Sequence, residues 1–394
     1  MLNGNAYYSL CQYLVNMILA HALSHYYLNF FVLLLSAVAT SSSVSAFLIQ
    51  NGGVYNSVAK PLRSSELDET ELITVIGVVA PLTSVGPYAC LGLNFPNIKR
   101  KPGGAEIKFV LDTAANVNTL SSDLASALGL PVVIKGEDLS ILGSAGAGGS
   151  FKAGDIVLLG DSRLSGMPEN QQSDTFMTNM TVAAMNLGIA NSVGGGMLGT
   201  SFFNCFRGGV EFDWYGTHGD PPTLIFYYDN LPDNAKENAS CVPVNTEEFF
   251  GVPTVSVNIN GKELRAIIDT GSPITIISPT VATEVGISKK EGTVKIKGID
   301  DGDAMEVSKS LDEVTISIGD INLNLDTIFI GDLPGLAMAS NLLPEGRQPQ
   351  VLLGLDALRR TYRMILRLSK AELWLEGLSD ANSAEFTSDV KLHT

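Results

Sequence analysis

Histidine is nearly absent from the 394-residue chain, which contains only His21, His25, His218 and His393. The first two lie in an apolar N-terminal stretch, and the last lies in a polar C-terminal tail. A Ser-His-Asp or Cys-His catalyst would therefore depend on His218, and no G-x-S-x-G motif accompanies this residue. Zinc sites built from several histidines are excluded for the same reason. We interpret His218 as a solvated residue of a glycine-rich loop.

Cysteine is also scarce, with four residues and no C-x-x-C spacing. Cys11 falls in the apolar N-terminal stretch, which leaves Cys90, Cys205 and Cys241 for the rest of the chain. This pattern lacks the spacing of zinc sites and thioredoxin-like redox sites, and it is not that of a disulfide scaffold. A single bridge between Cys205 and Cys241 is compatible with the sequence but is not indicated by it. We expect neither a metal ion nor another cofactor.

Positive charge is outnumbered, because 25 Lys and Arg residues stand against 41 Asp and Glu residues, a formal net charge of −16. Such a surface repels phosphate backbones, so we expect no nucleic acid partner. Aromatic residues make up only 7% of the chain, whereas glycine occurs 39 times and apolar residues reach 45%. These values favour a turn-rich, mainly β protein with enough apolar material for two packed domains or one bilobal unit.

The N-terminal region has no Asp, Glu, Lys or Arg before Lys60, and residues 13–39 are almost continuously apolar. Small residues follow and end at Ala46, which suits the pocket of a signal peptidase. The apolar run is also long enough to cross a bilayer. Residues 1–46 are therefore predicted to be a signal peptide or a membrane anchor, unless translation starts at Met17. Either form would bring the chain into the secretory pathway.

The segment after this leader has a composition of its own. From Phe47 to Ser65 it contains two basic residues and no acidic one. The Ala46-Phe47 junction followed by this composition resembles the bipartite leader of algae with secondary plastids, where a signal peptide meets a transit peptide. Residues 47–70 are accordingly interpreted as a transit segment or a pro-segment. Three destinations stay open: secretion, anchoring in a membrane, or the plastid of a secondary-plastid alga.

Two segments of the chain repeat each other at a spacing of 157 residues. The residues Phe109–Ala115 (FVLDTAA) align with Ala266–Ser272 (AIIDTGS), and the match continues without gaps for some distance. Later in each copy, two apolar residues precede a glycine, at Gly199 and Gly354. These glycines follow the aspartates of the two copies by 87 and 85 residues. Two landmarks at nearly equal spacing indicate a duplicated lobe.

Each half carries strand patterns, which alternate or are rich in β-branched residues between Gly, Asn and Asp. We expect strands at 106–111, 156–159, 253–259, 314–318 and 323–330, and short helices at 122–128 and 280–285 that end at a glycine. A polar stretch separates the halves. The predicted domains are an N-terminal lobe over 71–230, a linker over 231–243, a C-terminal lobe over 244–378 and a polar tail over 379–394.

Asp112 and Asp269 differ from other aspartates in their context. Each follows three apolar residues, precedes Thr and small residues, and has a copy in the other half. Two carboxyl groups brought together cannot both ionise at low cost, so one keeps its proton. The ionised group can then accept a proton from water while the neutral group donates one to a substrate carbonyl. The pair titrates as a unit, so the sequence does not assign the acid and the base.

The motif Asp269-Thr270-Gly271-Ser272, with the later apolar-apolar-Gly landmark, resembles the signature of the aspartic proteases. The resemblance covers about residues 71–375 and is to bilobal pepsin-type enzymes, with compact lobes that are also similar to a fused pair of retropepsin subunits. It implies a mainly β acid-protease fold of two homologous β-barrel-like lobes with a cleft between them, preceded by the signal or anchor segment. It also implies a monomeric aspartic endopeptidase that cleaves a polypeptide substrate, with Asp112 and Asp269 as catalytic residues.

The same resemblance implies supporting roles for neighbouring residues. Thr113 and Thr270 would hydrogen-bond across the lobe interface, and Gly271 and Ser272 would complete the second active-site turn. A flap would cover the cleft, and the glycine-rich stretch 142–151 lies at the corresponding place. This stretch lacks the tyrosine of pepsin-type flaps and is also compatible with a plain flexible loop. Its candidate flap residues are Gly143, Gly146, Gly148 and Gly149.

The first copy departs from the family pattern. Ala114 occupies the position of the family's glycine, and Ala115 occupies that of its common serine. Ala114 adds a Cβ beside the carboxylate and disfavours a positive φ angle, and Ala115 has no hydroxyl to bond the aspartate. These changes leave a second interpretation open, a catalytically silent aspartic-protease fold that acts as a peptide-binding or interaction module.

Overall fold

The computed structural model describes residues 49–50, 53–54, 77–98, 104–136, 144–145, 151–152, 154–167, 175–187, 194–216, 221–246, 251–296, 304–332 and 348–378. The described residues from 77 onward belong to one compact unit, and its architecture is mainly β, as the composition predicts. The predicted leader (1–46) and tail (379–394) lie outside the described residues. Within the described residues, no helix is long and apolar enough to cross a membrane.

The N-terminal half is built on an eight-stranded sheet of order β4-β5-β6-β13-β7-β12-β11-β8. An extra pairing of β5 with β11 closes this sheet into a barrel-like form around an apolar core. In β6, Ile107 and Phe109 are buried while Glu106 and Lys108 are exposed, as expected for a strand with one face on a core. The strands are β4 (Thr83–Val85), β5 (Tyr88–Phe95), β6 (Ala105–Leu111), β7 (Thr119–Ser121), β8 (Val132–Ile134), β11 (Asp155–Leu164), β12 (Met177–Met185) and β13 (Gly195–Leu198).

The C-terminal half follows the same plan, in the order β20-β21-β24-β19-β25-β18-β17, with β22 paired to β17 and β23 paired to β22. The predicted strand at 314–318 is confirmed as β22. The strands are β17 (Thr254–Ile259), β18 (Lys262–Ile268), β19 (Ile276–Ile277), β20 (Val294–Ile296), β21 (Met305–Lys309), β22 (Val314–Ile318), β23 (Ile321–Leu325), β24 (Phe329–Ile330) and β25 (Val351–Leu353).

The single strand predicted at 323–330 is wrong, because the chain changes partners within it. β23 ends at Leu325 and forms a hairpin with β22, whereas β24 starts at Phe329 and pairs with β19 and β21. Asp326 and Thr327 lie between the two strands. The apolar pattern continues through the break because both strands contribute to the same core.

Short helices follow the repeated landmarks of both halves. The predicted helix at 122–128 is confirmed as α2 (Ser122–Leu128), and Gly129 after it has a left-handed φ of 61°. The helix predicted at 280–285 is α5 (Pro279–Glu284), whose N-cap Ser278 accepts a hydrogen bond from the Val281 N–H. Two one-turn helices begin directly after Gly199 and Gly354, namely α4 (Thr200–Phe203) and α7 (Leu355–Leu358).

The strand register repeats between the halves, which gives the duplication a structural form. Leu111 of β6 lies opposite Leu198 of β13 in a parallel pair. In the other half, Ile268 of β18 lies opposite Leu353 of β25 in the same orientation. β13 pairs in turn with β7, and β25 pairs with β19, both antiparallel. The two halves therefore fold by the same strand exchange, and in both the repeated aspartate comes one residue after the strand.

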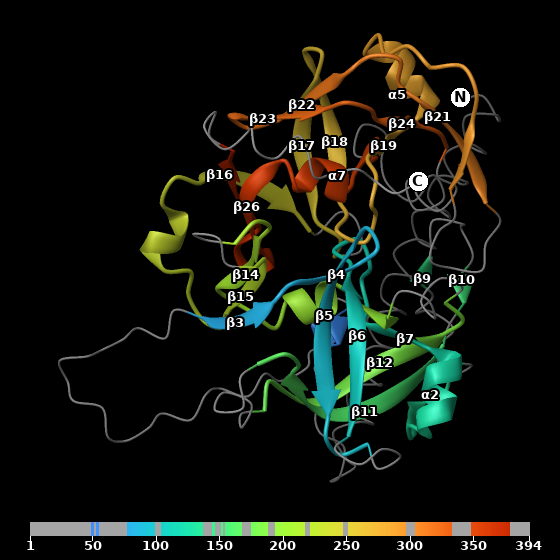
Figure 1. Cartoon of the computed structure of the whole chain (residues 1–394), viewed down its shortest axis with the longest axis vertical. Helices are drawn as coiled ribbons and strands as arrows, with labels where there is room; N and C mark the ends of the chain where they lie inside the picture. The colour runs from blue at the N-terminus through green and yellow to red at the C-terminus, as the bar shows by residue number, and fades with distance from the viewer. Residues whose placement is uncertain are drawn as a thin grey trace, which may run out of the picture. The chain divides into compact units, whose positions relative to one another are not determined.

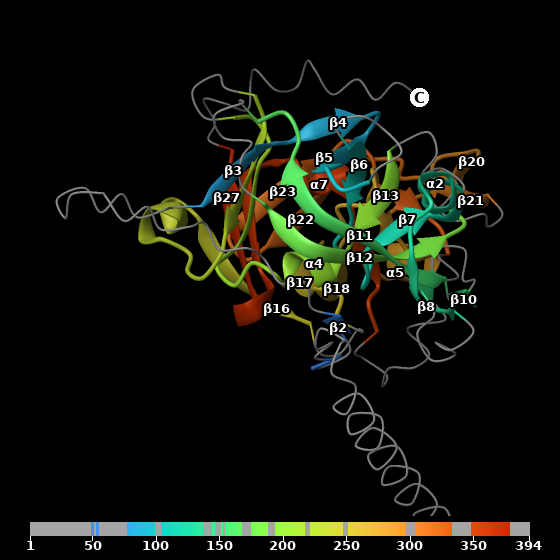
Figure 2. The ribbon, with the colours of Figure 1, turned by 90° about the horizontal axis from the view of Figure 1, so that it is seen from below.

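A six-stranded extension of the C-terminal sheet joins the halves, in the order β3-β15-β14-β26-β27-β16, and it connects to that sheet through the pairing of β16 with β17. Its central pair is β14 from the N-terminal half and β26 from the C-terminal half, which run antiparallel. Figures 1 and 2 show β3 and β16 on the side of the body opposite α2. Because strands from both ends of the body are interleaved, the halves share backbone hydrogen bonds. The strands are β3 (Val78–Pro81), β14 (Gly209–Asp213), β15 (Thr223–Tyr227), β16 (Ser240–Asn245), β26 (Thr361–Arg367) and β27 (Glu372–Gly377).

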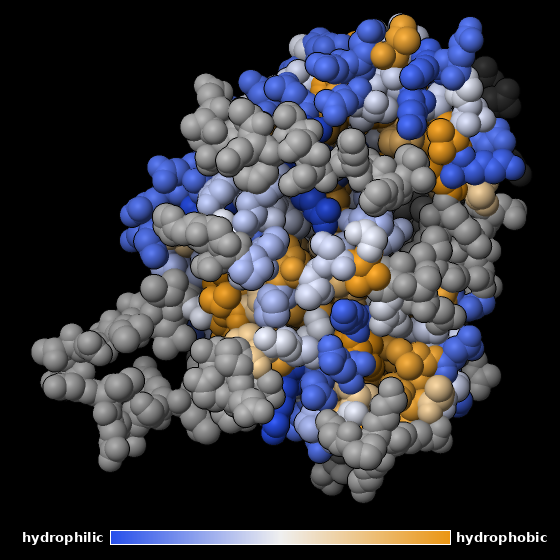
Figure 3. All heavy atoms as spheres, viewed as in Figure 1, coloured by the Kyte–Doolittle hydropathy of each residue, from blue (hydrophilic) through white to orange (hydrophobic). Residues whose placement is uncertain are grey.

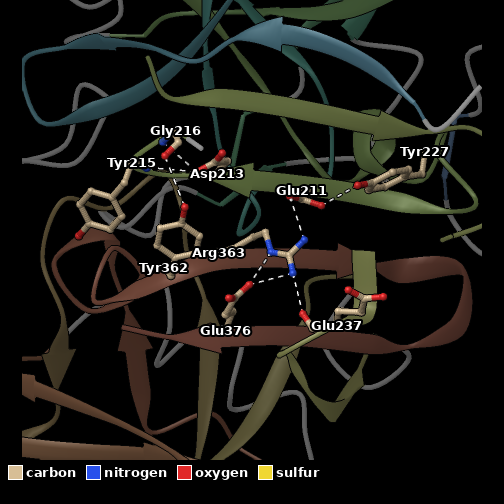
Figure 4. A network of polar contacts seen from close by, with 9 residues as sticks. All are labelled: Glu211, Asp213, Tyr215, Gly216, Tyr227, Glu237, Tyr362, Arg363 and Glu376. Atoms are coloured by element: carbon tan, nitrogen blue, oxygen red, sulfur yellow. Dashed lines mark hydrogen bonds and ion pairs between the residues drawn. The ribbon is translucent and has the colours of Figure 1, made fainter. Parts of the chain in front are cut away.

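Arg363 on β26 ties this sheet together through polar contacts (Figure 4). Its guanidinium group forms ion pairs with Glu211 of β14 at 3.5 Å and with Glu376 of β27 at 2.8 Å. It also donates a hydrogen bond of 2.9 Å to the backbone carbonyl of Glu237, in the predicted linker. The buried Glu211 carboxylate accepts a further hydrogen bond from Tyr227 at 2.6 Å. One side chain thus bridges the N-terminal half, the C-terminal half and the segment between them.

The linker and the cysteines are ordinary parts of this frame. The linker contains a short 3-10 helix, η4 (Asp233–Lys236), and a second such turn, η5 (Leu368–Lys370), connects β26 to β27. None of Cys90, Cys205 and Cys241 is in a disulfide, so the bridge between Cys205 and Cys241 that the sequence allows does not form. Hydrophilic residues cover the upper part of the face in Figure 3, and hydrophobic residues reach the surface mainly lower down.

Substituting Arg363 tests the importance of this bridge. In Arg363→Ala we expect unfolding free energy to fall by about 3 kcal/mol, because Glu211 would stay buried without its cation. Urea unfolding measures the change. Lys262→Ala is the matched control, because it removes a solvent-exposed ion pair with Glu284 and should cost less than about 1 kcal/mol. Equal losses in the two variants would contradict the structural role of Arg363.

Candidate active site

Asp112 and Asp269 occupy equivalent positions at the ends of β6 and β18. The Asp112 N–H donates to the carbonyl of Leu198 at 2.9 Å, and the Asp269 N–H donates to that of Leu353 at 3.0 Å. Each aspartate is therefore held by the last residue of the strand that pairs beside its own. The apolar residues before it are buried in the core, so the carboxyl group is carried on a rigid support.

Each carboxyl group is oriented by its own turn. Oδ1 of Asp112 accepts hydrogen bonds from the N–H groups of Ala114 and Ala115, both at 2.9 Å. Oδ1 of Asp269 accepts the equivalent bonds from Gly271 at 2.8 Å and Ser272 at 3.0 Å. These bonds engage the same oxygen in both turns. Oδ2 of each aspartate takes no part in them.

Thr113 and Thr270 lock the two turns to each other. The Thr113 hydroxyl donates to the carbonyl of Ile268 at 2.6 Å, and the Thr270 hydroxyl donates to that of Leu111 at 2.8 Å. Each hydroxyl oxygen also accepts the backbone N–H of the other threonine, at 3.0 and 3.1 Å. Both side chains are fully buried. The structure thus contains the cross-interface hydrogen bonds that the family resemblance implies.

This lock brings the Asp112 carboxyl group against the other turn. A Cβ placed on Gly271 would lie 2.6 Å from Oδ2 of Asp112, so the absence of a side chain at Gly271 makes room for that carboxyl group. The equivalent residue of the first turn is Ala114, which already carries a methyl group. The two turns therefore present unlike surfaces, with hydrogen atoms on one side and a methyl group on the other.

The two carboxyl groups interact electrostatically. Burial raises the pKa of Asp112 to about 6, against the bonds from Ala115 and Ala114, which lower it. Burial raises the pKa of Asp269 well above its ordinary value, and the negative charge of Asp112 raises it further. A group whose pKa responds to its neighbour's charge lies close to it. Together the pair can hold one proton over a wide range of pH.

Polar residues beneath the turns were not identified from the sequence. In the C-terminal half, the Asp356 carboxylate accepts hydrogen bonds from the hydroxyl and N–H of Thr275, at 2.6 and 2.9 Å. The Thr275 hydroxyl oxygen accepts the N–H of Gly354 at 3.1 Å. In the N-terminal half, the Asn118 side chain accepts the N–H of Gly199 at 3.0 Å. The position of Asp356, two residues after the landmark glycine, is the signal that would have identified this support.

The glycines of the landmarks allow these close contacts. A Cβ on Gly199 would lie 2.6 Å from the carbonyl oxygens of Ala115 and Val117. After each glycine the chain turns back to its aspartate loop. The Thr200 N–H donates to the backbone carbonyl of Ala115 at 2.7 Å, and the Leu355 N–H donates to that of Ser272 at 2.8 Å. The landmark glycines therefore support the two turns from below.

The Ser272 hydroxyl does not bond the aspartate of its turn, although its position in the motif suggests such a bond. Its hydroxyl donates to the carbonyl of Ile274 at 2.8 Å, and no bond joins it to Asp269. The missing hydroxyl at Ala115 therefore removes a turn contact of this kind and leaves the bonds to the Asp112 carboxylate in place. Of the two departures in the first copy, Ala114 is the one at the position equivalent to Gly271, which lies against the opposite carboxyl group.

The candidate flap lies largely outside the described residues, including Gly143, Gly146, Gly148 and Gly149. The strands on either side are described: β9 (Ser144–Ala145) pairs antiparallel with β10 (Phe151–Lys152). In the part of the chain that the structure describes, no group of three or more His, Cys, Asp and Glu side chains is arranged to hold a metal ion.

The fit at Gly271 can be tested by exchanging the third residues of the two turns. We expect Gly271→Ala to lower unfolding free energy by about 1–3 kcal/mol, because the new methyl group would overlap the Asp112 carboxyl group. Ala114→Gly is the matched control and should cost about 1 kcal/mol or less, the backbone entropy of one glycine. Urea unfolding of both variants gives the comparison. A Gly271→Ala variant as stable as the wild type would mean that the carboxyl group does not pack there.

The raised pKa values predict that the pair destabilises the fold at higher pH. A carboxyl group with a higher pKa in the folded chain binds more protons when folded, so stability is lost as pH rises through the folded-state pKa. For Asp112 this loss runs from about pH 4, where the unfolded group ionises, to beyond about 6. We expect Asp269→Asn to reduce the decline in urea midpoint between pH 4 and 8, because the amide cannot ionise. Asp326→Asn, which changes an exposed carboxylate, should leave the decline unchanged. A decline of equal size in all three proteins would contradict the coupling.

Three comparisons relate the chain to known proteins. The family model described as aspartyl protease matches residues 255–357. DNA damage-inducible protein 1 of Chaetomium globosum is 28% identical over 153 residues, 37% of this chain and 30% of that protein. The UBA domain-containing protein Mud1 of Schizosaccharomyces pombe is 30% identical over 145 residues, 36% of this chain and 39% of that protein. The chain thus spans about a third of the length of these curated relatives.

Solved structures with a similar course include an aspartic proteinase from Irpex lacteus, which is 11% identical with a TM-score of 0.42. That comparison covers 77% of this chain and 98% of the other. Conglutin gamma from lupine seeds is 12% identical with a TM-score of 0.44, covering 77% and 95%. The matched residues 255–357 contain Asp269-Thr270-Gly271-Ser272 and the later landmark glycine. The family match and the curated relatives thus support an aspartic protease superfamily for the part of the chain that they cover.

Proposed function

We propose that the chain is an aspartic endopeptidase with the acid-protease fold, in which two homologous lobes each contribute one catalytic aspartate, Asp112 and Asp269. The substrate is a polypeptide, and a single chain contains both halves of the site. The observation that carries this proposal is the buried threonine lock, because it joins two aspartate turns from distant parts of the chain. A structural role alone would not require two carboxyl groups with raised pKa values to face each other at such a cost.

The proposed reaction uses a water molecule held between the two carboxyl groups. The ionised carboxylate accepts a proton from this water while the water oxygen forms a bond to the peptide carbonyl carbon. The neutral carboxyl group donates its proton to the carbonyl oxygen, which gives a tetrahedral diol. The C–N bond then breaks as the nitrogen accepts a proton and one hydroxyl returns its proton to the pair. The proton count of the pair is restored, and neither residue is assigned a fixed role.

The difference between the two turns supports a second candidate function, peptide binding without catalysis. Ala114 carries a methyl group at the position equivalent to Gly271, and Gly271 lies next to the opposite carboxyl group. A methyl group there takes space that a bound water needs. If that space is insufficient, the chain would be a catalytically silent member of the superfamily that binds peptides. The same assay separates the two functions.

Single substitutions at the two aspartates test the proposal. Asp112→Asn and Asp269→Asn should each lower the cleavage rate of a denatured protein substrate by about 1,000-fold or more, because each removes one partner of the proton exchange. Cleavage is measured across about pH 3 to 9, with and without a pepstatin-like inhibitor, which should abolish the wild-type activity.

Asp326→Asn is the control, because Asp326 also precedes a threonine but lies exposed between β23 and β24. It should retain wild-type activity. Full activity in either Asp112→Asn or Asp269→Asn would end the two-aspartate mechanism. A wild-type protein that binds peptide without cleaving it at any pH would support the silent peptide-binding function instead.

A further inference from the structure

Tyr88 stands close to the candidate dyad but belongs to none of its motifs. It is the first residue of β5, directly after the turn at Gly86 and Pro87 that connects β4 to β5. In the β5–β6 pair, Cys90 lies opposite Val110. Continuing this antiparallel register by two residues along each chain brings Tyr88 opposite Asp112. Figure 1 shows β4 and the start of β5 where the N-terminal half meets the C-terminal half.

The ring of Tyr88 rests on an apolar cluster that is separate from the main core. The buried members of this cluster are Cys90, Val110, Leu187 and Met197, and Tyr88 is half-buried against them. Val110 precedes Asp112 by two residues, so the two side chains leave their chain on the same side. The phenol is therefore held by packing on the side of β6 from which the Asp112 carboxyl group emerges.

The Tyr88 hydroxyl lies in the field of both carboxyl groups. Burial raises the pKa of Tyr88, and the negative charges of Asp269 and Asp112 raise it further. The phenol therefore keeps its proton, which it can donate, at least up to the pH at which an ordinary tyrosine ionises. Among the described residues, no protein group accepts a hydrogen bond from this hydroxyl. A half-buried donor beside two acids, with no protein acceptor, is available to a bound molecule.

The equivalent position of the C-terminal half carries no hydroxyl. In the β17–β18 pair, Thr254 lies opposite Ile267, and the same continuation by two residues brings Val252 opposite Asp269. Val252 is a buried apolar residue. The two sides of the dyad thus differ, with a phenol beside Asp112 and an isopropyl group beside Asp269. A hydrogen-bond donor on one side only makes the site asymmetric about the two aspartates.

We propose that Tyr88 contacts the substrate, and that its hydroxyl donates a hydrogen bond to the carbonyl oxygen of the peptide bond held between Asp112 and Asp269. This inference rests on the proposed function. Negative charge develops on that oxygen when water adds to the carbonyl carbon, and a donor fixed in advance stabilises this charge. The carbonyl oxygen of a bound peptide would be the hydrogen-bond acceptor that the described residues of the protein do not provide for this hydroxyl.

Tyr88→Phe isolates the hydroxyl, because the ring and its packing on the cluster are kept. We expect kcat to fall about 10- to 100-fold with KM changed less than about threefold, because the lost bond strengthens during the reaction. Tyr88→Ala should raise KM as well, because it also removes the ring. Thermal unfolding of each variant checks that the fold is intact.

Tyr362→Phe is the matched control. Its half-buried ring stacks on Tyr215 in the sheet that joins the halves, and its hydroxyl donates to the Gly216 carbonyl at 3.5 Å. This variant should keep the wild-type kcat and KM. The peptide used is one that the wild type cleaves and that Asp112→Asn and Asp269→Asn do not.

The outcomes separate this inference from the function on which it rests. Unchanged kcat in Tyr88→Phe, with both aspartate variants inactive, would overturn the role of Tyr88 alone. A shift in the pH profile of kcat/KM without a loss of kcat would also overturn it, because the hydroxyl would then serve the carboxyl groups of the free protein. A wild-type protein that cleaves no peptide would overturn the proposed function and this inference together.

Discussion

The buried exchange of hydrogen bonds between Thr113 and Thr270 is the constraint on which the rest of the site depends. Each hydroxyl both donates to and accepts from the half of the molecule opposite its own, so all four bonds require both turns in place. Breaking any of them would leave a polar group unpaired in a fully buried environment, which costs about 1–3 kcal/mol. The lock therefore sets the distance between two carboxyl groups that repel each other when ionised.

The two halves keep one backbone plan and have diverged in the side chains that face the dyad. Gly271 corresponds to Ala114, Val252 corresponds to Tyr88, and beneath the turns Thr275 corresponds to Asn118. The polar support also differs. Asp356 accepts two hydrogen bonds from Thr275, whereas Ser201, the equivalent of Asp356 in the N-terminal half, is buried with its hydroxyl unpaired. The backbone bonds that fix each aspartate have the same partners and similar lengths in both halves. The two turns thus share their backbone geometry and differ in their side chains.

The parts of the structure that sequence reasoning predicted are those with a local or repeated signal. The bounds of α2 follow from a glycine after an amphipathic turn, and the meeting of the aspartate turns follows from a motif that occurs twice. The break between β23 and β24 could not be predicted, because the apolar alternation continues while the pairing partner changes. The pairing of β14 with β26 joins segments about 150 residues apart, and neither strand carries a mark of its partner. The position of Tyr88 likewise depends on cross-strand register, which periodicity does not contain.

The linker between the halves has a consequence for how the site forms. β14 and β26 exchange backbone hydrogen bonds along the middle of a shared sheet, and Arg363 adds a bond to the linker itself. Because both partners are on one polypeptide, their meeting is an intramolecular event governed by the effective concentration that the linker imposes. The two aspartate turns therefore meet to an extent that does not depend on the concentration of the protein. A substitution in one half also changes only one side of the site. If the site were formed by two identical chains, the same substitution would appear on both sides.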